Sequence, residues 1–381
     1  MDHEEAHDKY HEQKIEQDTP ESIRRELNFK SSMIIFLVLL VIFIVAVVAI
    51  AFFLIGQSKQ LEMLDSQTKP PQPEVYSATT PGPFKELTIP YLASRQYESS
   101  MGELRQISSN ANYNSYLTNY SSDGLNINGL LTQPAGQEPE GGFPAIVFVH
   151  GYIPPTTYQT NGESYSDYVD YLARNGFVVF KIDLRGHGES EGEPGGAYYS
   201  GDYVIDVLNA RNALQKLNFV NDKKIGLWGH SMAGNVIFRS FVAAKDIPAI
   251  VIWGGAVYTY SDMRELGIDD NSYRPPEDDS ERQKQRKALF DTYGEFDERS
   301  EFWKTVVPTN YLDGLTGAVQ INHALNDEVV SIGYSRGLEE ILKNANIKTE
   351  LNEYSGGGHN ITGSYFTQAM NETVRFFREN L

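Results

Sequence analysis

A serine at the centre of a short pattern of small residues is the strongest candidate for chemistry in the sequence. The segment 229–234 (GHSMAG) follows a short apolar run and precedes a stretch with helical spacing. A serine hydroxyl becomes a useful nucleophile when a tight strand-to-helix turn exposes it, and small flanking residues let such a turn close. The fifth residue of the pattern is Ala233 where glycine is usual, which still keeps the side chain small. We therefore predict Ser231 as the nucleophile of an acyl-transfer reaction.

A serine nucleophile needs a base to take its proton, and two histidines follow Ser231 in the chain, His323 and His359. His359 stands after a predicted strand and directly behind the glycines at 356–358, in a loop suited to carry an imidazole over the edge of a sheet. His323 stands at the end of a predicted strand, within the segment expected to deliver the acid. We therefore predict His359 as the general base.

The base in turn needs a carboxylate that orients it, and in this arrangement the acid precedes the histidine in the chain. Asp327 stands in the loop just after the apolar run at 318–322. Asp313 precedes that run and would lie at its opposite end, and Glu328 is expected to point away. We therefore predict Asp327 as the orienting acid.

The oxyanion of a tetrahedral intermediate needs two main-chain N–H donors. Met232, which follows the nucleophile at the start of a helix, is expected to supply one. The loop after the apolar run at 145–149 is expected to supply the other, from Tyr152. We predict that His150, His187 and His230 are structural hydrogen-bonding residues rather than bases.

The segments around these residues alternate between short apolar runs and longer stretches with helical spacing. The predicted strands are 125–132, 145–149, 177–182, 224–228, 249–253, 318–322 and 350–354. The predicted helices are 165–174, 203–217, 235–244, 334–344 and 366–377. Such alternation is typical of βαβ units, so it predicts a mostly parallel sheet covered by helices on both faces. Ligands bind beyond the carboxyl ends of the strands in such sheets, where the candidate residues stand.

The alternation stops at about 259–315, which we interpret as a helical cap insertion over the site. Helical spacing recurs there at 280–293 and 300–307. The insertion is rich in acidic residues. Asp269 and Asp270 are candidates for holding a substrate ammonium group, and the alternative is that they are solvated surface residues, as acidic residues on a cap more often are.

These motifs together resemble the α/β-hydrolase superfamily of serine hydrolases, and the resemblance extends over residues 120–381. It rests on the His-Gly pair at 150–151, the segment DLRGHGES at 183–190, the turn around Ser231, Asp327 and His359. The resemblance implies an α/β-hydrolase fold with a triad of Ser231, Asp327 and His359.

Within that superfamily, the segment 122–134 (SDGLNINGLLTQP) resembles the entry to the catalytic domain of the prolyl oligopeptidase family. The stretch before Tyr120 is too short for the β-propeller that gates many members of that family, and the loop HGYIPP at 150–155 differs from their usual glycine-rich loop. The segment RGHGES is equally similar to monoacylglycerol lipases and to the serine aminopeptidase branch.

A separate apolar segment near the N-terminus predicts a membrane anchor. Residues 33–55 contain no charged residue, no polar side chain, no glycine and no proline. As a helix they would be about 34 Å long, enough to cross a hydrocarbon core of about 30 Å. We expect a single-pass transmembrane helix at 33–55, preceded by a polar tail at 1–32 and followed by a proline-rich linker at 56–84. The hydrolase domain is expected over 85–381.

The positive charges beside the apolar segment predict its orientation. Arg24, Arg25 and Lys30 lie close to its N-terminal end, whereas Lys59 and Lys69 are the nearest on the other side. By the positive-inside rule this bias favours a cytoplasmic N-terminus and a catalytic domain outside, at the cell membrane. The lipid bilayer is therefore an expected partner through 33–55.

Composition excludes several other classes of function. The chain of 381 residues has 32 Lys and Arg against 51 Asp and Glu, a net charge of −19, which argues against nucleic acid as a partner. It has no cysteine, which rules out disulfides, thiolate metal sites and a cysteine nucleophile. We expect no metal and no organic cofactor, because serine, histidine and aspartate chemistry requires neither.

The leading hypothesis is a membrane-anchored hydrolase that cleaves small peptides or esters through an acyl-enzyme, with a peptidase of the prolyl oligopeptidase type placed first. One alternative is a carboxylesterase or an enzyme like monoacylglycerol lipase. A second alternative is a non-catalytic binding protein on a hydrolase fold.

Overall fold

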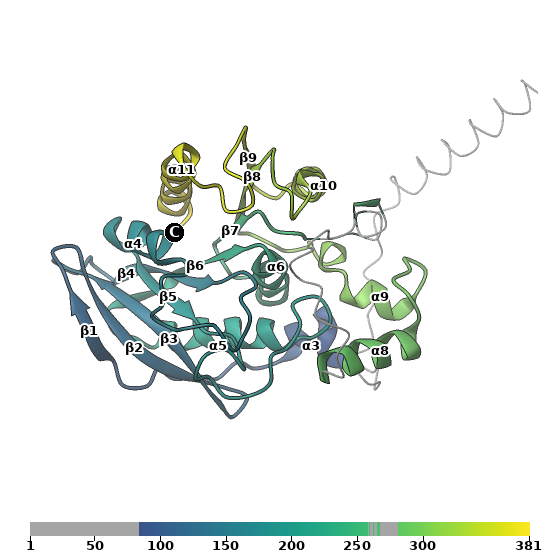
Figure 1. Ribbon diagram of the computed structural model, residues 1–381, viewed down its shortest axis with the longest axis horizontal. Coiled ribbons are helices and arrows are strands. Elements are labelled where there is room, and N and C mark those ends of the chain that lie inside the picture. The colour runs from purple at the N-terminus through teal and green to yellow at the C-terminus, as the bar shows by residue number, and fades with distance from the viewer. Residues whose placement is uncertain (1–83, 258, 260–261, 263–264, 267–280) are drawn as a thin grey trace, which may run out of the picture. The chain divides into compact units, whose positions relative to one another are not determined.

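A nine-stranded β-sheet lies at the centre of the computed structural model (Figure 1). The strands lie side by side in the order β1-β2-β3-β5-β4-β6-β7-β8-β9. The pairs from β1 to β5 are antiparallel, and the pairs from β5 to β9 are parallel. The strand bounds are β1 Arg105–Ser109, β2 Tyr113–Ser122, β3 Leu125–Pro134, β4 Phe143–Val149, β5 Val178–Ile182, β6 Val220–His230, β7 Ala249–Trp253, β8 Ala318–Ala324 and β9 Thr349–Tyr354.

Helices cover both faces of this sheet. Buried side chains of α5, α6 and α10 pack in one apolar cluster on one face, and those of α4 and α11 pack in another on the opposite face. The helix bounds are η1 Lys85–Leu87, α3 Ile89–Ser94, α4 Ser166–Arg174, α5 Asp202–Gln215, α6 Met232–Ala244, α8 Glu281–Tyr293, α9 Glu301–Val306, η3 Pro308–Asn310, α10 Ile332–Asn344 and α11 Ser364–Asn380.

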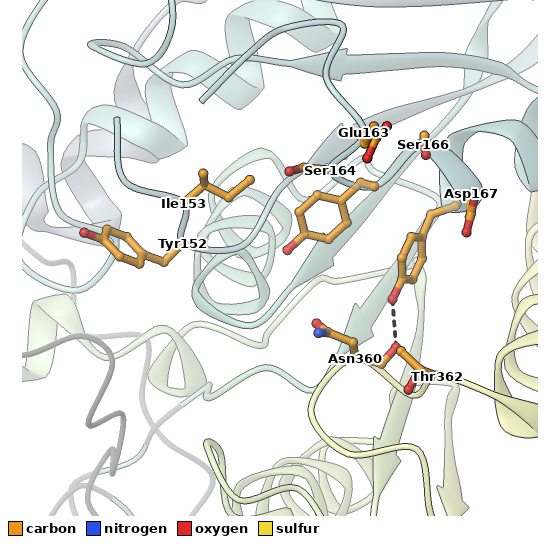
Figure 2. Close-up of a pocket in the computed structure, with 10 residues that line it drawn as sticks. Tyr152, Ile153, Glu163, Ser164, Ser166, Asp167, Asn360 and Thr362 are labelled. Carbon is orange, nitrogen blue, oxygen red and sulfur yellow. Dashed lines mark hydrogen bonds between the residues drawn. The ribbon is translucent and has the colours of Figure 1, made fainter. Parts of the chain in front are cut away.

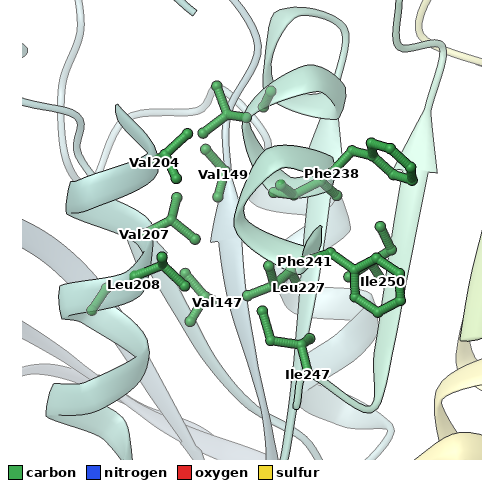
Figure 3. Packing of buried hydrophobic residues seen from close by; sticks show 14 of the residues in the cluster. Val147, Val149, Val204, Val207, Leu208, Leu227, Phe238, Phe241, Ile247 and Ile250 are labelled. Atoms are coloured by element: carbon green, nitrogen blue, oxygen red, sulfur yellow. The ribbon is translucent and has the colours of Figure 1, made fainter. Parts of the chain in front are cut away.

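The central strand β4 shows why the sheet needs both layers of helices. Val147 and Val149 point towards α5 and α6, where Figure 3 shows them among side chains of those helices. Ile146 and Phe148 belong to the opposite cluster, and all four side chains are fully buried. A strand that is apolar at every position is stable only when both of its faces are covered.

The structure describes residues 84–257, 259, 262, 265–266 and 281–381. The predicted tail at 1–32, the transmembrane helix at 33–55, the linker up to residue 83 and the acidic candidates Asp269 and Asp270 lie outside these residues. Within the ranges that are described, no helix combines the length and the apolar composition that crossing a bilayer requires.

All seven strands and five helices predicted over residues 125–377 are present, and the predicted mostly parallel sheet is confirmed. The two helices expected in the 259–315 insertion are also present, as α8 and α9. Their apolar side chains pack with Leu87 of η1 in a small cluster that includes Leu289, Phe302 and Trp303. A capping role for this segment stays a prediction.

Four elements near the start of the fold were not anticipated: η1, α3, β1 and β2. β2 has the sequence YNSYLTNYSS, and four of its ten side chains are buried, three of them polar. Hydrophobic alternation therefore gives no signal for it. Its stability comes from a ten-pair antiparallel ladder with β3, closed by a turn at Asp123 and Gly124, both with positive φ.

A buried ion pair fixes β2 and the loop after β5 to helix α5. Asp206 of α5 is fully buried and accepts hydrogen bonds from the guanidinium and the main-chain N–H of Arg185. It also accepts one from Ser122 Oγ at 2.7 Å. The Asp202 carboxylate lies 3.2 Å from the same guanidinium but is about one-third exposed. Asp206 is therefore the partner on which burial of Arg185 depends.

Replacing Asp206 should destabilise the fold strongly, because it leaves the buried Arg185 guanidinium with Asp202 as its ion-pair partner, and Asp202 is about one-third exposed. We expect Asp206→Ala to lower the free energy of unfolding by about 3–5 kcal/mol in a denaturant titration. The control Asp202→Ala removes a partly exposed partner and should lower it by less than about 1 kcal/mol. Equal losses in the two variants would contradict this interpretation.

Candidate active site

Ser231 occupies a strained turn between β6 and α6. Its backbone angles are φ 55° and ψ −122°, a region that residues with a side chain rarely adopt. Two main-chain hydrogen bonds hold the turn, from Ser231 N–H to Trp253 O and from Gly234 N–H to Ser231 O, each at 2.9 Å. A Cβ atom at Gly229 would lie 2.8 Å from the Ala233 carbonyl oxygen, so the turn closes only with glycine there. This is the backbone geometry predicted for a nucleophile.

The Asp327 carboxylate lies in the loop after β8, and its side chain is 1% exposed. One oxygen, Oδ1, accepts the N–H groups of Val329 at 2.8 Å and Val330 at 3.0 Å. The other, Oδ2, lies 2.8 Å from His359 Nδ1. The structure therefore brings together the two residues predicted as acid and base.

A second histidine contacts the same carboxylate. His323 Nε2 lies 3.2 Å from Asp327 Oδ2 and 2.9 Å from the Val330 carbonyl oxygen. Because a carbonyl can only accept, Nε2 carries a proton, and Nδ1 lies 2.6 Å from Ser335 Oγ. The sequence placed His323 beside the acid but did not predict this contact. The spacing of four residues from His323 to Asp327, with a strand end between them, was the available signal.

These donors keep the buried carboxylate ionised. Burial by itself would raise the pKa of Asp327, but hydrogen bonds from His323, His359 and the Val330 N–H together hold that pKa well below its ordinary value. The charged form is therefore the stable one next to the histidine that it orients.

His359 lies in the loop between β9 and α11 with its side chain 17% exposed. Its carbonyl oxygen is 3.0 Å from His230 Nε2, and the two imidazole rings lie 4.6 Å apart. His230 directly precedes Ser231 in the chain. The loop is also held by the Gly358 N–H, which donates to Asn326 Oδ1 at 3.0 Å. His359 therefore lies next to the turn that carries Ser231.

The predicted oxyanion donors lie at the ends of two neighbouring strands. Met232 is the first residue of α6, and the first N–H groups of a helix have no partner within it. Tyr152 follows β4, which pairs with β6 up to Val149 and Gly229. Met232 directly follows Ser231 in the chain. Gly151, which precedes Tyr152, lies beside His230, because a Cβ atom at Gly151 would be 2.9 Å from His230 Nδ1.

The histidines predicted to be structural are buried. His150 and His187 have rings 5.1 Å apart, and His150 stacks on Tyr158 at 4.4 Å. Burial lowers the pKa of His150 well below its ordinary value, and it lowers the pKa of His230 to about 3. His150 and His230 are therefore neutral at ordinary pH.

A cavity of about 390 Å³ opens beside the His359 loop. Figure 2 shows its walls coming from three segments: the loop after β4, the start of α4 and the loop that follows His359. The dashed line marks the hydrogen bond from Tyr168 Oη to the Asn360 carbonyl oxygen, at 2.7 Å. The lining residues are Tyr152, Ile153, Glu163, Ser164, Tyr165, Ser166, Asp167, Tyr168, Asn360 and Thr362.

Two tyrosines of this wall, Tyr165 and Tyr168, contact the site through their hydroxyl groups and were missed by the sequence analysis. Tyr165 Oη lies 2.7 Å from His230 Nδ1. The two residues are three apart at the start of a predicted helix, so they share one side of it. That spacing was the only sequence feature that pointed to a shared role, and it does not predict which groups their hydroxyls contact.

Two family models match the chain. One, described as "Serine aminopeptidase, S33", matches residues 143–267, a range that includes Tyr152 and Ser231. The other, described as "BAAT / Acyl-CoA thioester hydrolase C terminal", matches residues 208–380, which include Ser231, Asp327 and His359. Each covers less than half of the chain.

Curated and solved proteins give a consistent picture. "Uncharacterized peptidase YtmA" of Bacillus subtilis is 26% identical over 248 residues, covering 64% of this chain and 85% of that protein. Porphyromonas gingivalis dipeptidyl peptidase 4 is similar in structure with a TM-score of 0.53 at 20% identity, covering 71% of this chain and 36% of that one. Acetyl xylan esterase from Paenibacillus sp. R4 is similar in structure with a TM-score of 0.55 at 16% identity. The match covers 77% of this chain and 92% of the esterase. This chain therefore spans about a third of the dipeptidyl peptidase, and at these identities the two structures establish the fold.

The lowered pKa of Asp327 predicts how its contribution to stability depends on pH. A carboxyl group whose folded pKa lies below its ordinary value of 3.8 stabilises the fold above that value, and the contribution is lost as the pH falls towards the folded pKa. At pH 7 we expect Asp327→Asn to unfold with about 1–3 kcal/mol less free energy than the wild type. The difference should narrow as the pH falls from about 4 to about 2. A difference that stays constant over that interval would show that Asp327 is not held ionised.

The similarities to known proteins agree with the geometry of the chain itself. The fold is similar to that of the solved hydrolases, and the family model for serine aminopeptidases includes the strained turn at Ser231. Peptidases and esterases both occur among the matching proteins. The chain has the α/β-hydrolase fold, and it is a serine hydrolase.

Proposed function

We propose that this chain is a membrane-anchored serine peptidase that acts outside the cytoplasm on small peptides through an acyl-enzyme. The observation that carries the proposal is the 2.8 Å contact between Asp327 Oδ2 and His359 Nδ1 beside the strained turn at Ser231. These are the three residue types that acyl transfer needs, in the order Ser, Asp, His along the chain.

In this mechanism Ser231 Oγ attacks the substrate carbonyl, and His359 Nε2 takes its proton. The Asp327 carboxylate accepts from His359 Nδ1, which leaves Nε2 free to act as the base and stabilises the imidazolium that forms. His359 then gives the proton to the leaving group. A water molecule, activated by the same imidazole, hydrolyses the acyl-enzyme and restores Ser231.

The negative charge that develops on the carbonyl oxygen is assigned to two main-chain N–H groups, those of Met232 and Tyr152. Met232 lies at the N-terminus of α6, where the helix dipole also favours negative charge. Two fixed donors of this kind stabilise the tetrahedral intermediate without reorganisation during the reaction.

The polar cavity beside the His359 loop supports a peptide or another small polar substrate. Among its ten lining residues only Ile153 is aliphatic, and the rest carry hydroxyl, amide or carboxylate groups. A long acyl chain would find little apolar surface there to bury. The match to the serine aminopeptidase family model and the peptidase name of the Bacillus subtilis relative point the same way.

The alternative is a carboxylesterase or an enzyme like monoacylglycerol lipase. It is favoured by the structural likeness to an acetyl xylan esterase and by the match to the acyl-CoA thioester hydrolase model. The chemistry would be the same, because an ester and an amide carbonyl are attacked by the same nucleophile. The two proposals differ in the leaving group that His359 protonates.

Measuring kcat for the wild type and three variants should distinguish the nucleophile and the base from a neighbouring histidine. Ser231→Ala and His359→Ala should each lower kcat by about 10⁴–10⁶-fold, because the triad acts as a unit. His323→Gln is the matched control, since it alters the other histidine on Asp327, and should lower kcat by about tenfold or less. Aminoacyl and prolyl p-nitroanilides, with short-chain p-nitrophenyl esters in parallel, give the rates.

The substrate panel also decides between the two proposed activities. Amide cleavage that depends on Ser231 would support the peptidase, whereas ester turnover with inert amides would support the esterase. If Ser231→Ala keeps wild-type activity, or if His323→Gln loses as much as His359→Ala, the assignment of roles is wrong.

The anchor proposed from residues 33–55 predicts how the protein fractionates. The whole chain should sediment with membranes and stay there in alkaline carbonate, which strips peripheral proteins. Deletion of residues 33–55 should move the protein into the supernatant. Protease added to intact cells should digest the hydrolase domain of the whole chain. A chain that remains soluble with 33–55 present would contradict the anchor.

A further inference from the structure

The Tyr165 hydroxyl lies at a junction between two loops of the proposed site. It is 2.9 Å from Gly151 N, in the loop that carries Tyr152, and 2.7 Å from His230 Nδ1, beside Ser231. The ring is packed edge-on against Phe148 at 5.6 Å and lies 5.6 Å from the His230 ring. The mechanism proposed above assigns no role to this residue.

The direction of each hydrogen bond in this junction can be assigned. His230 Nε2 lies 3.0 Å from the His359 carbonyl oxygen, which can only accept, so the proton is on Nε2. His230 is neutral because burial lowers its pKa to about 3, so Nδ1 is an acceptor. The Tyr165 O–H must then donate to Nδ1, and its oxygen accepts from the Gly151 N–H. One chain of hydrogen bonds thus runs from Gly151 through Tyr165 and His230 to the main chain of His359.

The surrounding backbone leaves room for these hydrogen bonds. A Cβ atom at Gly151 would lie 2.6 Å from Tyr165 Oη and 2.9 Å from His230 Nδ1, so only glycine leaves room for both. Tyr165 itself has a positive φ of 64° as the residue preceding α4. Such a conformation in a tyrosine costs about 1–3 kcal/mol and persists only where the surroundings hold it.

We propose that Tyr165 and His230 are positioning residues that set the place of the Tyr152 N–H and of the His359 imidazole relative to Ser231. The inference rests on the proposed function, because it concerns the same oxyanion donor and the same base. Neither residue touches the reacting atoms. The Tyr165 hydroxyl binds the main-chain N–H of Gly151, and the His230 imidazole binds the main-chain carbonyl of His359.

Loss of the Tyr165 hydroxyl should therefore reduce the rate of the chemical step more than substrate binding. We expect Tyr165→Phe in the whole chain to lower kcat by about 10–100-fold, because misplacement of about 1 Å at a reacting group has an effect of that size. KM for the same substrate should change by less than about threefold, as for an interaction made in the transition state.

The control is Tyr171→Phe, which removes a tyrosine hydroxyl from α4, the helix that Tyr165 precedes. Tyr171 Oη donates to Asn371 Oδ1 at 2.7 Å, and neither group belongs to the site. Its kcat and KM should equal those of the wild type. If Tyr165→Phe and Tyr171→Phe are alike, the inference is wrong.

Two variants of His230 test the second member of the chain and do not depend on Tyr165→Phe folding. A glutamine side chain can still donate an N–H towards the His359 carbonyl, whereas leucine cannot. We expect His230→Gln to retain at least about fivefold more kcat than His230→Leu, at similar melting temperatures. Equal kcat in these two variants would overturn the positioning role. Activity that persists in Ser231→Ala would instead overturn the proposed function.

Discussion

The backbone conformation of Ser231 is the constraint on which the rest of the site depends. A positive φ in a non-glycine residue is unfavourable, so the turn must be held by its surroundings. It is held by hydrogen bonds to Trp253 O and from Gly234 N–H, and by the absence of a side chain at Gly229. β7, which supplies Trp253, is fully buried, so the apolar core of the sheet is what fixes the geometry of the nucleophile.

The parallel part of the sheet brings the remaining groups to the same edge. Tyr152 follows β4, Ser231 follows β6, Asp327 follows β8 and His359 follows β9. The carboxyl ends of parallel strands all meet at one edge, so four distant parts of the sequence become neighbours without long loops. Hydrogen bonds between side chains and main chain then adjust their positions. The Asp327 carboxylate fixes the His359 ring, and His230 holds its carbonyl.

The sequence predicted the elements that carry strong local patterns. The apolar strands of the parallel sheet and the glycine-bounded turn at Ser231 are of this kind, and both are present. β2 escaped prediction because its buried side chains include Ser115, Thr118 and Ser122, which give no apolar alternation. The contact of Tyr165 with His230 escaped because the residues are 65 apart in the chain, so no local spacing records it. The pattern of apolar residues predicts which strands are buried. Hydrogen bonds between polar groups that are distant in the sequence depend on the tertiary structure, so the local pattern does not predict them.

The central claim is that Ser231 is an activated nucleophile. The most direct test is to treat the chain with a fluorophosphonate, which reacts with activated serines, and to locate the adduct by peptide mass spectrometry. The account predicts a single adduct, on the peptide that contains Ser231, and its loss in His359→Ala because the base no longer takes the proton. An unlabelled protein, or an adduct at another serine, would contradict it.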